Sequence, residues 1–464
     1  MKSDDPLLIA WDETLARKRD AAAIFETSGE VSRTFADIEQ RARILGHKIE
    51  MFDAKSVVGI QIGNHPDWPA LFIACLRRQL IVLPLEQSMG EQQRDTALDI
   101  CQVCAVVAAV PGGKSIEVLR LRTAAPTEEW EYPPVLLKLT SGTTSAPRMV
   151  RFRSEQLLAD CDQICATMGI CDLDLNFGVI PISHSYGFSN LLTPLIARGV
   201  PMVLSRDRVP RAVLVDLAQT NATVLPGSPV LYQAFCDMKD VPNLPKLRLC
   251  ISAGAPLSAA VARNFLGQFE QPLHSFYGSS ECGGICYDCG ENIFEDGFVG
   301  TPLKGVSLTI IDPKADSSQV QVRSAAVGDD YFPEPDRDKL GDGIFTPDDL
   351  LARCGDGLKI VGRISDVINV AGKKVNPALV EEQLLRFAGV REAIAFGRKS
   401  SQRNEEVAAC VVTNGKVNAA ELIDFCRAHL SAWQVPKRIF IVDEIPVTER
   451  GKISRRELAW RFGA

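Results

Sequence analysis

The chain has 464 residues, of which 46% are hydrophobic and 23% charged, and its formal net charge is −7. One hydrophobic core rarely organises more than about 250 to 300 residues, so this length favours two or more structural units. The composition excludes an intrinsically disordered chain, and the lack of a basic block argues against a nucleic-acid partner.

Apolar runs alternate with helical patterns in the first half of the chain. Residues 34–50 place apolar side chains at helical spacing, with Thr34 and Asp37 suited to the first turn, and predict an amphipathic helix. A second helix is predicted over residues 68–77. Strands are predicted over residues 57–62, 81–85, 105–110, 175–181, 201–204, 222–225 and 247–252. Strands alternating with helices indicate an α/β fold with a parallel sheet.

The pattern changes in the second half of the chain. Residues 300–311 and 320–323 are β-rich, and the polar residues 329–343 are expected to form an exposed loop. Further on, helices are predicted over residues 375–387 and 419–430, and strands over residues 392–397 and 407–412. These elements predict a small α+β domain, joined to the rest near residues 362–366.

No targeting or membrane segment is predicted. Residues 1–13 lack a basic start followed by a long apolar run, which a signal peptide would have. No stretch reaches the roughly 18 to 20 apolar residues that a membrane-spanning helix needs. We therefore expect a cytoplasmic protein with small molecules as its partners.

Fourteen cysteines are scattered along the chain, and reduced thiols are expected. Two Cys-x-x-Cys pairs, Cys101 with Cys104 and Cys286 with Cys289, have spacing compatible with a zinc site, and Cys282 is close to the second pair. The pairs are far apart in the sequence and have no histidine nearby. Packing as small buried side chains is the favoured interpretation, and whether the pairs bind anything stays open.

The most informative stretch is residues 139–150, with the sequence LTSGTTSAPRMV. Residues 140–145 combine hydroxyl side chains with one glycine, and Arg148 follows. Backbone N–H groups and hydroxyls can surround phosphate oxygens, and a guanidinium can pair with them in bidentate fashion. The stretch is not a Walker A motif. It predicts a polyphosphate ligand, with a flexible Ser/Thr-rich loop as the alternative.

Three further motifs follow in order: YGSSE at residues 277–281, GRISDVINVAGKKVNP at 362–377 and PVTERGK at 446–452. Together the four segments resemble the adenylate-forming superfamily of acyl-CoA synthetases, aryl-CoA ligases, luciferases and peptide-synthetase adenylation domains, over nearly the whole chain. The resemblance implies a large N-terminal AMP-binding domain, residues 1–362, with layered α/β subdomains and a small β-barrel-like part. It also implies a small mobile α+β domain, residues 363–464, that carries the catalytic lysine.

The resemblance implies how ATP is held. The β- and γ-phosphates are expected to contact Thr140, Ser141, Gly142, Thr143, Thr144 and Arg148. The adenosine is expected to contact Gly254, Ala255, Pro256, Tyr277, Gly278 and, at the ribose, Asp349. Ser145, Arg148 and Asp348 stand where the family usually has Gly, Lys and Gly, so the ribose contact could shift by one residue.

The resemblance also implies the catalytic groups. Glu281 is expected to coordinate Mg²⁺, because its carboxylate is a hard oxygen ligand. Ser280 would contact the α-phosphate, and Arg363 the ribose or the α-phosphate. Lys452 would bridge the substrate carboxylate and the α-phosphate, where a cation stabilises the charge that develops in the transition state.

The acyl pocket is expected to involve His184, Tyr186, Ser228, Phe276 and Gly278, with His184 as the gate to the thiol tunnel. Amino-acid-activating relatives carry an aspartate in this region, and residues 180–192 contain none. Acetate-specific relatives have a Trp where Gly278 stands. An uncharged acyl or aryl acid larger than acetate is therefore favoured.

The second half-reaction is expected to use a domain rotation about the hinge Ser365, which brings Gly372 and Lys374 to the tunnel for coenzyme A. The expected function is ATP-dependent activation of a medium-chain acyl or aryl acid, followed by transfer to the thiol of coenzyme A. One alternative acceptor is the phosphopantetheine of an acyl carrier protein. A catalytically degenerate nucleotide-binding protein is the alternative that Ser145, Ser365 and Asp348 favour.

Overall fold

The computed structural model describes residues 4–110, 115–121, 130, 132–140, 147–207, 209–290, 295–370, 373–400, 404–415, 417–446 and 454–462, with only the backbone at 365, 374, 400, 404 and 456. The chain divides into two compact units. The first comprises residues 1–310, 321–347 and 353–359, and the second residues 311–320, 348–352 and 360–464.

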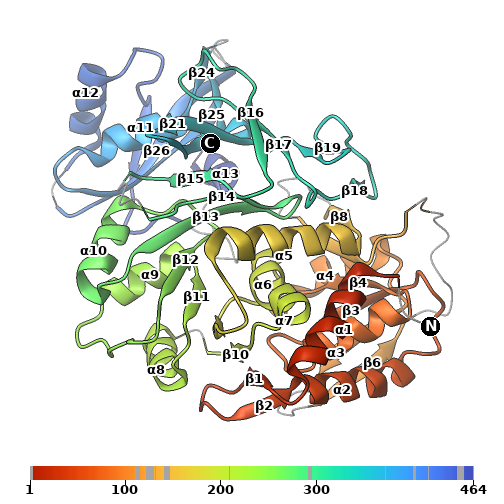
Figure 1. Ribbon diagram of the computed structural model, residues 1–464. Coiled ribbons are helices and arrows are strands. Elements are labelled where there is room, and N and C mark those ends of the chain that lie inside the picture. Colours follow the sequence, from red (N-terminus) through yellow and green to blue (C-terminus); the bar gives the residue numbers. More distant parts are fainter. Residues whose placement is uncertain are drawn as a thin grey trace. The chain divides into compact units, whose positions relative to one another are not determined.

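The helices of the first unit lie between strands along most of its length (Figure 1). They are α1 (Pro6–Lys18), α2 (Phe35–Lys48), α3 (Trp68–Arg77), α4 (Glu91–Ile100), α5 (Ser154–Met168), α6 (Ser185–Gly187), the π-helix η1 (Phe188–Leu192), α7 (Thr193–Arg198), α8 (Pro210–Thr220), α9 (Pro229–Cys236) and α10 (Ala259–Phe269). Helix α3 has the predicted bounds. Helix α2 begins with a capping box between Thr34 and Asp37, which satisfies free N–H groups of the first turn.

Seven strands form the first sheet, in the order β18-β8-β7-β4-β3-β5-β6. They are β3 (Val57–Gln61), β4 (Ile81–Pro84), β5 (Ala105–Ala109), β6 (Ile116–Arg120), β7 (Leu136–Leu139), β8 (Met149–Phe152) and β18 (Tyr331–Phe332). The central pairs β3–β4, β3–β5 and β4–β7 are parallel. Strands β7 and β8 form an antiparallel hairpin, so the segment between them returns to the sheet.

A second sheet begins with the strands β2 (Val31–Thr34), β1 (Ala22–Phe25), β10 (Met202–Leu204), β9 (Asn176–Gly178), β11 (Val224–Gly227), β12 (Leu249–Ser252) and β13 (Leu273–Ser279). It continues through β14 (Gly283–Tyr287), β15 (Phe298–Pro302), β22 (Gly357–Arg363) and β21 (Asp349–Cys354). The pairs from β1 through β10, β9, β11 and β12 to β13 are parallel, which confirms the predicted parallel sheet. Strands β13, β14 and β15 are antiparallel.

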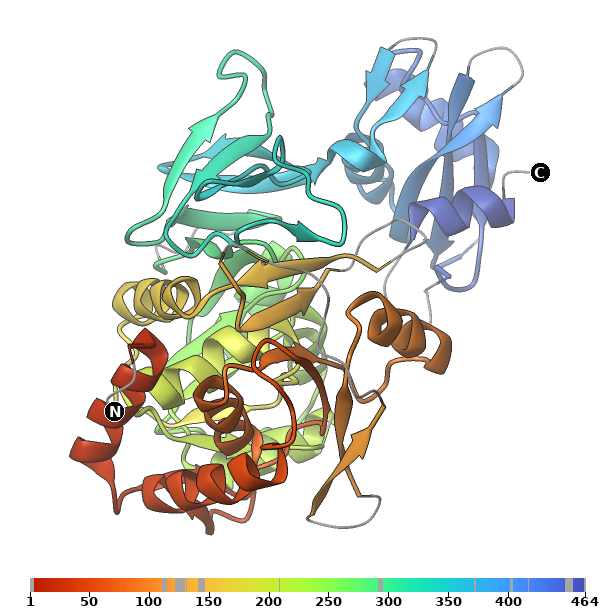
Figure 2. The ribbon, with the colours of Figure 1, turned by 90° about the vertical axis from the view of Figure 1, so that its right-hand side faces the viewer.

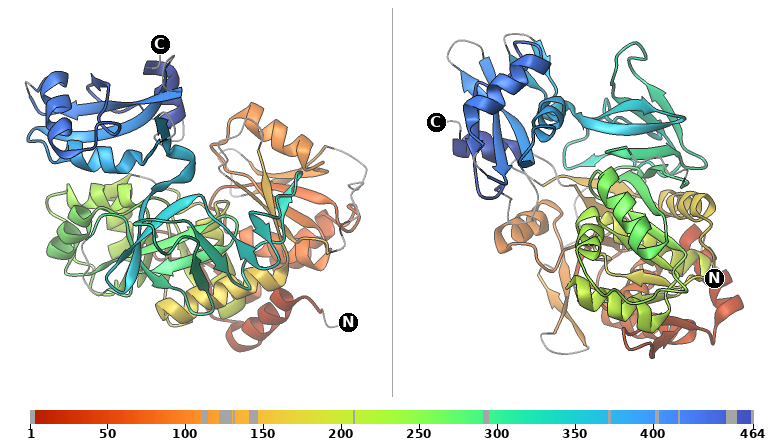
Figure 3. Two further views of the ribbon diagram at one scale, coloured as in Figure 1. Left: turned by 90° about the horizontal axis from the view of Figure 1, so that it is seen from above. Right: turned by 90° about the vertical axis from the view of Figure 1, so that its left-hand side faces the viewer.

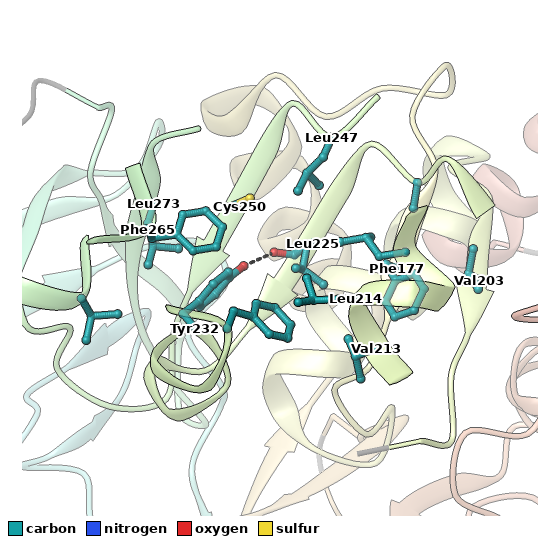
Figure 4. Close-up of a cluster of buried hydrophobic side chains, with 14 of the residues drawn as sticks. Phe177, Val203, Val213, Leu214, Leu225, Tyr232, Leu247, Cys250, Phe265 and Leu273 are labelled. Carbon is teal, nitrogen blue, oxygen red and sulfur yellow. Dashed lines mark hydrogen bonds between the residues drawn. The ribbon is translucent and has the colours of Figure 1, made fainter. Parts of the chain in front are cut away.

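The core under this sheet is built from aromatic and aliphatic side chains of β9 to β13 and α8 to α10 (Figure 4). Tyr232 is fully buried there, and its hydroxyl donates to Leu225 O at 2.6 Å. That bond removes the cost of an unpaired hydroxyl in an apolar core. On the other side of the unit, α1 packs beside α5, and the two helices are adjacent in Figure 3.

The predicted exposed loop at residues 329–343 is wrong in part. It contains the strands β18 and β19 (Leu340–Gly341), and Asp330, Tyr331 and Phe332 are buried. Strand β18 pairs with β8, and Asp330 accepts hydrogen bonds from the backbone of Tyr331 and Asp336, which offsets the cost of its burial. Strand β19 belongs to a four-stranded sheet with β16 (Ser307–Ile310), β17 (Val320–Arg323) and β20 (Ile344–Phe345).

The second unit contains a five-stranded sheet covered by helices on both faces. Its elements are η2 (Ile364–Asp366), β23 (Ile368–Val370), β24 (Lys373–Val375), α11 (Pro377–Leu385), β25 (Val390–Ser400), β26 (Asn404–Thr413), α12 (Ala419–His429), β27 (Arg438–Ile441) and α13 (Arg455–Phe462). Successive side chains of β25 and β26 point to opposite faces of the sheet. One set packs against α11 and α12, and the other against α13, which Figure 2 shows on its face of the sheet. The predicted small α+β domain is confirmed.

All fourteen cysteines are free thiols, and Cys101, Cys104 and Cys286 are buried. Among the described residues, no group of three or more His, Cys, Asp or Glu side chains could hold a metal ion. No helix in the described parts of the chain is both long and apolar enough to cross a membrane.

Candidate active site

The hydroxyl-rich segment of the sequence is the connection between β7 and β8. Its ends are held together because Thr140 donates to Arg148 O from its backbone N, at 2.9 Å, and from its hydroxyl, at 3.1 Å. Residues Ser141, Gly142, Thr143 and Thr144 lie outside the described part of the chain. The hairpin therefore places Arg148 directly beside the start of the predicted phosphate loop.

Arg148 is held by residues that follow Asp330. Its guanidinium carbon lies 3.9 Å from the centre of the Tyr331 ring, and its Nη2 donates to Glu334 O at 3.2 Å. Asp336 lies 3.9 Å from the same nitrogen. Among the residues that the structure describes, the buried Nε has no hydrogen-bond partner. A guanidinium fixed by its flat face and one edge keeps a donor for an anionic ligand.

Glu281 lies in the turn between β13 and β14. Its Oε1 accepts a hydrogen bond from the Tyr331 hydroxyl at 3.2 Å, and its backbone N donates to Ser279 Oγ at 3.2 Å. Its own carbonyl accepts from Gly328 N at 2.9 Å. Burial raises the pKa of the Glu281 carboxyl, while Ser279, Tyr331 and Lys339 act against that shift. The carboxylate is thus oriented from several sides.

The donor set fits a magnesium ion that is shared with substrate. Glu281 offers a hard carboxylate, and no group of three or more His, Cys, Asp or Glu side chains among the described residues could hold the ion by itself. Mg²⁺ commonly binds through one or two carboxylates together with substrate phosphates, rather than in an all-protein cage. The residues present therefore suit an ion that arrives with ATP.

The buried lysine Lys138, whose charged neighbours include Glu281, was not identified from the sequence. Lys138 of β7 is 4% exposed, and its ammonium lies 4.5 Å from the centre of the Phe152 ring. Burial lowers the pKa of Lys138, while Asp160, Cys282 and Glu281 act against that shift. Asp160 in turn accepts from Gly284 N at 2.9 Å. Only the folded structure reveals this cluster, since its members are distant in sequence.

The predicted adenine segment follows β12. Gly254, Ala255 and Pro256 are exposed, and Gly254 has φ +89°, a conformation that favours glycine. Tyr277 is buried on β13. Its stacking on a base stays a prediction.

Glycine is required at position 278 for a structural reason that the sequence did not reveal. A Cβ at this position would lie 2.6 Å from Gly283 O, on the neighbouring strand β14. Any larger residue would therefore require the backbone of the β13–β14 pair to move. The expectation that Gly278 leaves room for an acid larger than acetate stays a prediction, because the strand pairing alone already requires glycine.

Two of the predicted acyl residues, His184 and Tyr186, lie on a tight turn before η1. His184 is exposed and accepts from Tyr186 N through Nδ1 at 3.2 Å, so it also caps α6. Glycine is needed at Gly187, since a Cβ there would lie 2.1 Å from Pro181 O. Tyr186 donates its hydroxyl to Ile251 O at 3.1 Å, and its ring centre lies 5.9 Å from that of Phe276. Burial raises the pKa of the Tyr186 phenol.

The fifth acyl residue, Ser228, lies at the start of another helix. It caps α9, where its hydroxyl accepts from Leu231 N at 3.4 Å. The structure thus brings Tyr186 and Phe276 into contact. Ser228 follows Gly227, whose backbone opposes the rise that burial causes in the pKa of the Tyr186 phenol.

One hydrogen bond joins the acyl turn to the predicted α-phosphate contact. Ser185, next to His184, donates its hydroxyl to Ser280 Oγ at 2.9 Å. Ser280 is adjacent to Glu281. The two ends of the candidate site therefore meet at this pair of hydroxyls.

Asn64 is a further residue that sequence analysis missed. Its Nδ2 donates to Gly178 O at 3.1 Å, Ile180 O at 3.3 Å and Ser205 O at 3.1 Å, and its Oδ1 accepts from Ile182 N at 2.9 Å. These bonds fix the ends of β9 and β10 and the turn that leads to His184. An Asn in a loop carries no signal of such long-range contacts.

Two predicted residues, Asp349 and Arg363, belong to the second unit. Arg363 Nε donates to Asp349 Oδ1 at 2.8 Å, and Asp349 is the more buried of the two. The backbone carbonyl of Asp348 accepts from Ile364 N at 2.7 Å. Both aspartates hence lie beside the segment that leads to Ser365, and the choice between them as ribose contact stays a prediction.

Several predicted residues cannot be placed. Gly372 and Lys452 lie outside the described residues, as do the side chains of Ser365 and Lys374. Close to Lys452 in sequence, Arg455 pairs with Asp366 at 2.6 Å and Glu381 at 2.8 Å. Helix α13 is thereby fixed to η2 and α11 within the second unit.

Comparison with known proteins identifies the family. Residues 11–323 match the AMP-binding enzyme family, and residues 379–452 match the AMP-binding enzyme C-terminal domain. A probable CoA ligase of Humulus lupulus is 26% identical over 94% of this chain and 92% of its own. A 3,4-dihydroxybenzoate–[aryl-carrier protein] ligase of Bacillus anthracis is 29% identical over 70% of this chain and 73% of its own.

The fold is also that of a solved structure. The ATP-bound MatB of Rhodopseudomonas palustris matches with a TM-score of 0.85 and 21% identity, over 98% of both chains. This match confirms the mixed α/β fold with a large N-terminal and a small C-terminal domain. The chain is therefore an enzyme of the AMP-binding family, within the adenylate-forming superfamily of acid–thiol ligases, which activate acids as acyl-adenylates.

Proposed function

We propose that this enzyme uses ATP to activate an uncharged medium-chain acyl or aryl acid and then transfers the acyl group to the thiol of coenzyme A. The observation that carries this proposal is the 2.9 Å contact between Ser185 and Ser280. Ser185 borders the acyl turn, and Ser280 borders the carboxylate of Glu281. An acid and an α-phosphate held by these neighbours would lie close enough to react.

In the first step, a carboxylate oxygen attacks the α-phosphorus, and the bond from that phosphorus to the oxygen of the β-phosphate breaks. Pyrophosphate leaves with the bonding electrons. Arg148 is suited to hold the leaving phosphates, and Ser280 to donate to the α-phosphate. Magnesium would neutralise charge on the phosphate oxygens, with Glu281 as its protein ligand. In the second step, the thiol sulfur attacks the acyl carbon and AMP leaves.

The acyl end supports an uncharged substrate. Tyr186 and Phe276 present aromatic surfaces, and the Tyr186 hydroxyl is already bonded to Ile251 O. No acidic side chain lies between residues 180 and 192 to pair with an α-ammonium group. Aromatic side chains of this kind favour an aryl ring or a medium alkyl chain.

The acceptor has two candidates, coenzyme A and the phosphopantetheine of a carrier protein. The similar proteins include a CoA ligase and an aryl-carrier-protein ligase. Both acceptors present the same thiol arm, so Gly372 and Lys374 are proposed to line its path in either case. Turnover with free coenzyme A, measured without any carrier protein, would decide between them.

We assign Lys452 to adenylation and Gly372 to thioester formation, with Ser365 as hinge between domains 1–362 and 363–464. Lys452→Ala should lower acyl-adenylate formation by roughly 10² to 10³-fold, the scale for losing one oriented charge at a transition state. It should spare thioester formation from pre-made acyl-adenylate. Gly372→Leu should do the reverse. Equal damage to both half-reactions in both variants would refute the alternation.

The decisive experiment is acid-dependent exchange of labelled pyrophosphate into ATP. Short, medium, long and aromatic carboxylic acids would be compared with magnesium present. Exchange should be strongest with medium-chain or aryl acids and weak with acetate. Absence of exchange with every acid would instead favour a nucleotide-binding protein without catalysis.

A further inference from the structure

Tyr331 contacts both charged groups of the phosphate end. Its ring stacks under the guanidinium of Arg148, and its hydroxyl donates to Glu281 Oε1. It is 4% exposed, and β18 is fixed by pairing with β8, where Tyr331 lies opposite Val150. A rigid, buried ring therefore separates a cation that directly precedes β8 from an anion that follows β13.

The Tyr331 ring explains why an arginine suits position 148. A planar guanidinium stacks on an aromatic face while its edge donates hydrogen bonds, and a lysine ammonium cannot do both. Arg148 uses Nη2 for Glu334 O, and its buried Nε has no partner within the described part of the chain. The residues after Asp330 thus supply the support that keeps the guanidinium in one orientation.

The same ring orients the anion. A hydroxyl that donates to a carboxylate favours the charged form, which burial disfavours at Glu281. It also fixes Oε1, so the direction in which the carboxylate faces a cation is set by Tyr331.

We propose that Tyr331 is a positioning residue that joins Arg148 and Glu281 into one bracket, so that the phosphates of ATP and their magnesium ion bind as a unit. The inference rests on the proposed function, because it assumes that these two side chains face the nucleotide. It predicts two separable contributions from one side chain. The hydroxyl serves the magnesium-dependent part of binding, and the ring serves the phosphate-dependent part.

Three variants separate these contributions. Tyr331→Phe removes only the hydroxyl, Tyr331→Leu also removes the ring, and Arg148→Lys keeps the charge but replaces the planar guanidinium with an ammonium. Binding of ATP would be measured by calorimetry with and without magnesium, alongside a magnesium titration of pyrophosphate exchange. Tyr132→Phe is the matched control, since Tyr132 is exposed and lies 5.5 Å from the guanidinium of another arginine, Arg153.

Tyr331→Phe should raise the magnesium concentration for half-maximal binding about tenfold, the scale for a hydrogen bond to a charged group. Its affinity for metal-free ATP should stay unchanged. Tyr331→Leu and Arg148→Lys should both weaken metal-free ATP binding by about two- to sixfold, the scale of a cation–π contact. Thermal unfolding of each variant would confirm a folded protein.

The bracket is refuted if Tyr331→Phe leaves the magnesium titration of a folded enzyme unchanged, or if it weakens metal-free binding as much as Tyr331→Leu does. In either case, the proposed function would still stand if the wild-type enzyme catalyses acid-dependent pyrophosphate exchange. A wild-type protein that binds no ATP with magnesium would overturn both. Arg148→Lys gives a second, independent test should Tyr331→Leu fail to fold.

Discussion

The two ends of the candidate site are built in different ways. At the phosphate end, Arg148 and Glu281 come from separate segments, and each contacts Tyr331 through its charged side chain. At the acyl end, the turn before η1 is held by hydrogen bonds to backbone groups. Asn64 bonds to the backbone of Ile180 and Ile182, and the Tyr186 hydroxyl donates to Ile251 O. Single substitutions should therefore change chemistry at the first end and backbone placement at the second.

The largest effect is expected at the phosphate end. Glu281→Gln is nearly isosteric but removes a hard anionic ligand, so it should lower acyl-adenylate formation by roughly 10² to 10³-fold. The loss should be partly recovered at high magnesium concentration. Pyrophosphate exchange across a magnesium titration is the measurement. Glu295→Gln is the control, because Glu295 is exposed and pairs only loosely with Lys359, at 3.4 Å. Identical titrations for both variants would remove Glu281 from the site.

Sequence reasoning succeeded where the signal was local. The helix over residues 68–77 was predicted with its bounds, and the first turn of α2 contains the expected Thr34 and Asp37 contacts. The strands β3, β4 and β5 were found because continuous apolar runs are typical of parallel strands covered on both faces. Of the five predicted acyl residues, His184 and Tyr186 share one short motif, and Tyr186 lies against Phe276.

Sequence reasoning failed where the role of a residue depends on contacts with residues that are distant in the sequence. Tyr331 was assigned to a polar loop, because a two-residue strand gives no periodicity. Lys138 interrupts an otherwise apolar strand, and its neighbours Asp160 and Glu281 are far away in sequence. Asn64 looks like an ordinary turn residue. Only tertiary structure distinguishes these residues from their neighbours.

The second prediction tests whether the phosphate end has a buried charge that costs stability. Lys138→Met keeps a long side chain against Phe152 but removes the ammonium, so the variant should be more stable at pH 8, by about 1.4 kcal/mol for each pH unit by which the fold lowers the Lys138 pKa. Thermal or urea unfolding measures this gain. Lys304→Met is the control, because Lys304 is exposed and should change little.

The sign of the Lys138 effect depends on pH. Burial lowers the pKa of Lys138 in the folded state, so the unfolded chain binds the proton more tightly. The cost to the wild type is absent above the ordinary lysine pKa of about 10.4 and develops as the pH falls from there to the lowered value. The advantage of Met should therefore shrink as the pH rises through this window. A gain that is constant with pH would contradict a charge-based origin.

The third prediction concerns the backbone anchor of the acyl end. Asn64→Asp keeps the shape but removes the donor to Gly178 O, Ile180 O and Ser205 O, and should destabilise the protein by about 1 to 3 kcal/mol. The KM for the acid should rise more than the KM for ATP, because the turn to His184 loses its support. Both KM values and the unfolding curve are needed.

Gln61→Glu provides the matched control for Asn64. Gln61 lies at the end of β3 and its Nε2 donates to one carbonyl, Glu86 O, at 3.0 Å. It should cost less stability and leave both KM values unchanged. A KM for ATP that rises as much as that for the acid in Asn64→Asp would show that the anchor does not act on the acyl end selectively.

The smallest effect is expected for Tyr186→Phe, which keeps the ring against Phe276 and removes one hydroxyl. The Tyr232 hydroxyl, which donates its one hydrogen to Leu225 O at 2.6 Å, also lies 3.3 Å from Ile251 O and can share that hydrogen with it, so the loss at pH 8 should be only about 0.5 to 1.5 kcal/mol. Burial raises the pKa of Tyr186, so the phenol stabilises the fold below the ordinary value of about 10, and this contribution is lost as the pH rises further and the unfolded chain ionises. The unfolding curves of wild type and variant should therefore converge above that pH. The KM for the acid should stay within about twofold, since a hydroxyl bonded to the backbone is not available to substrate. A tenfold change in that KM would mean that the Tyr186 hydroxyl turns from Ile251 O to the acid, and the acyl end would then select its substrate by a polar side chain rather than by the placement of its backbone.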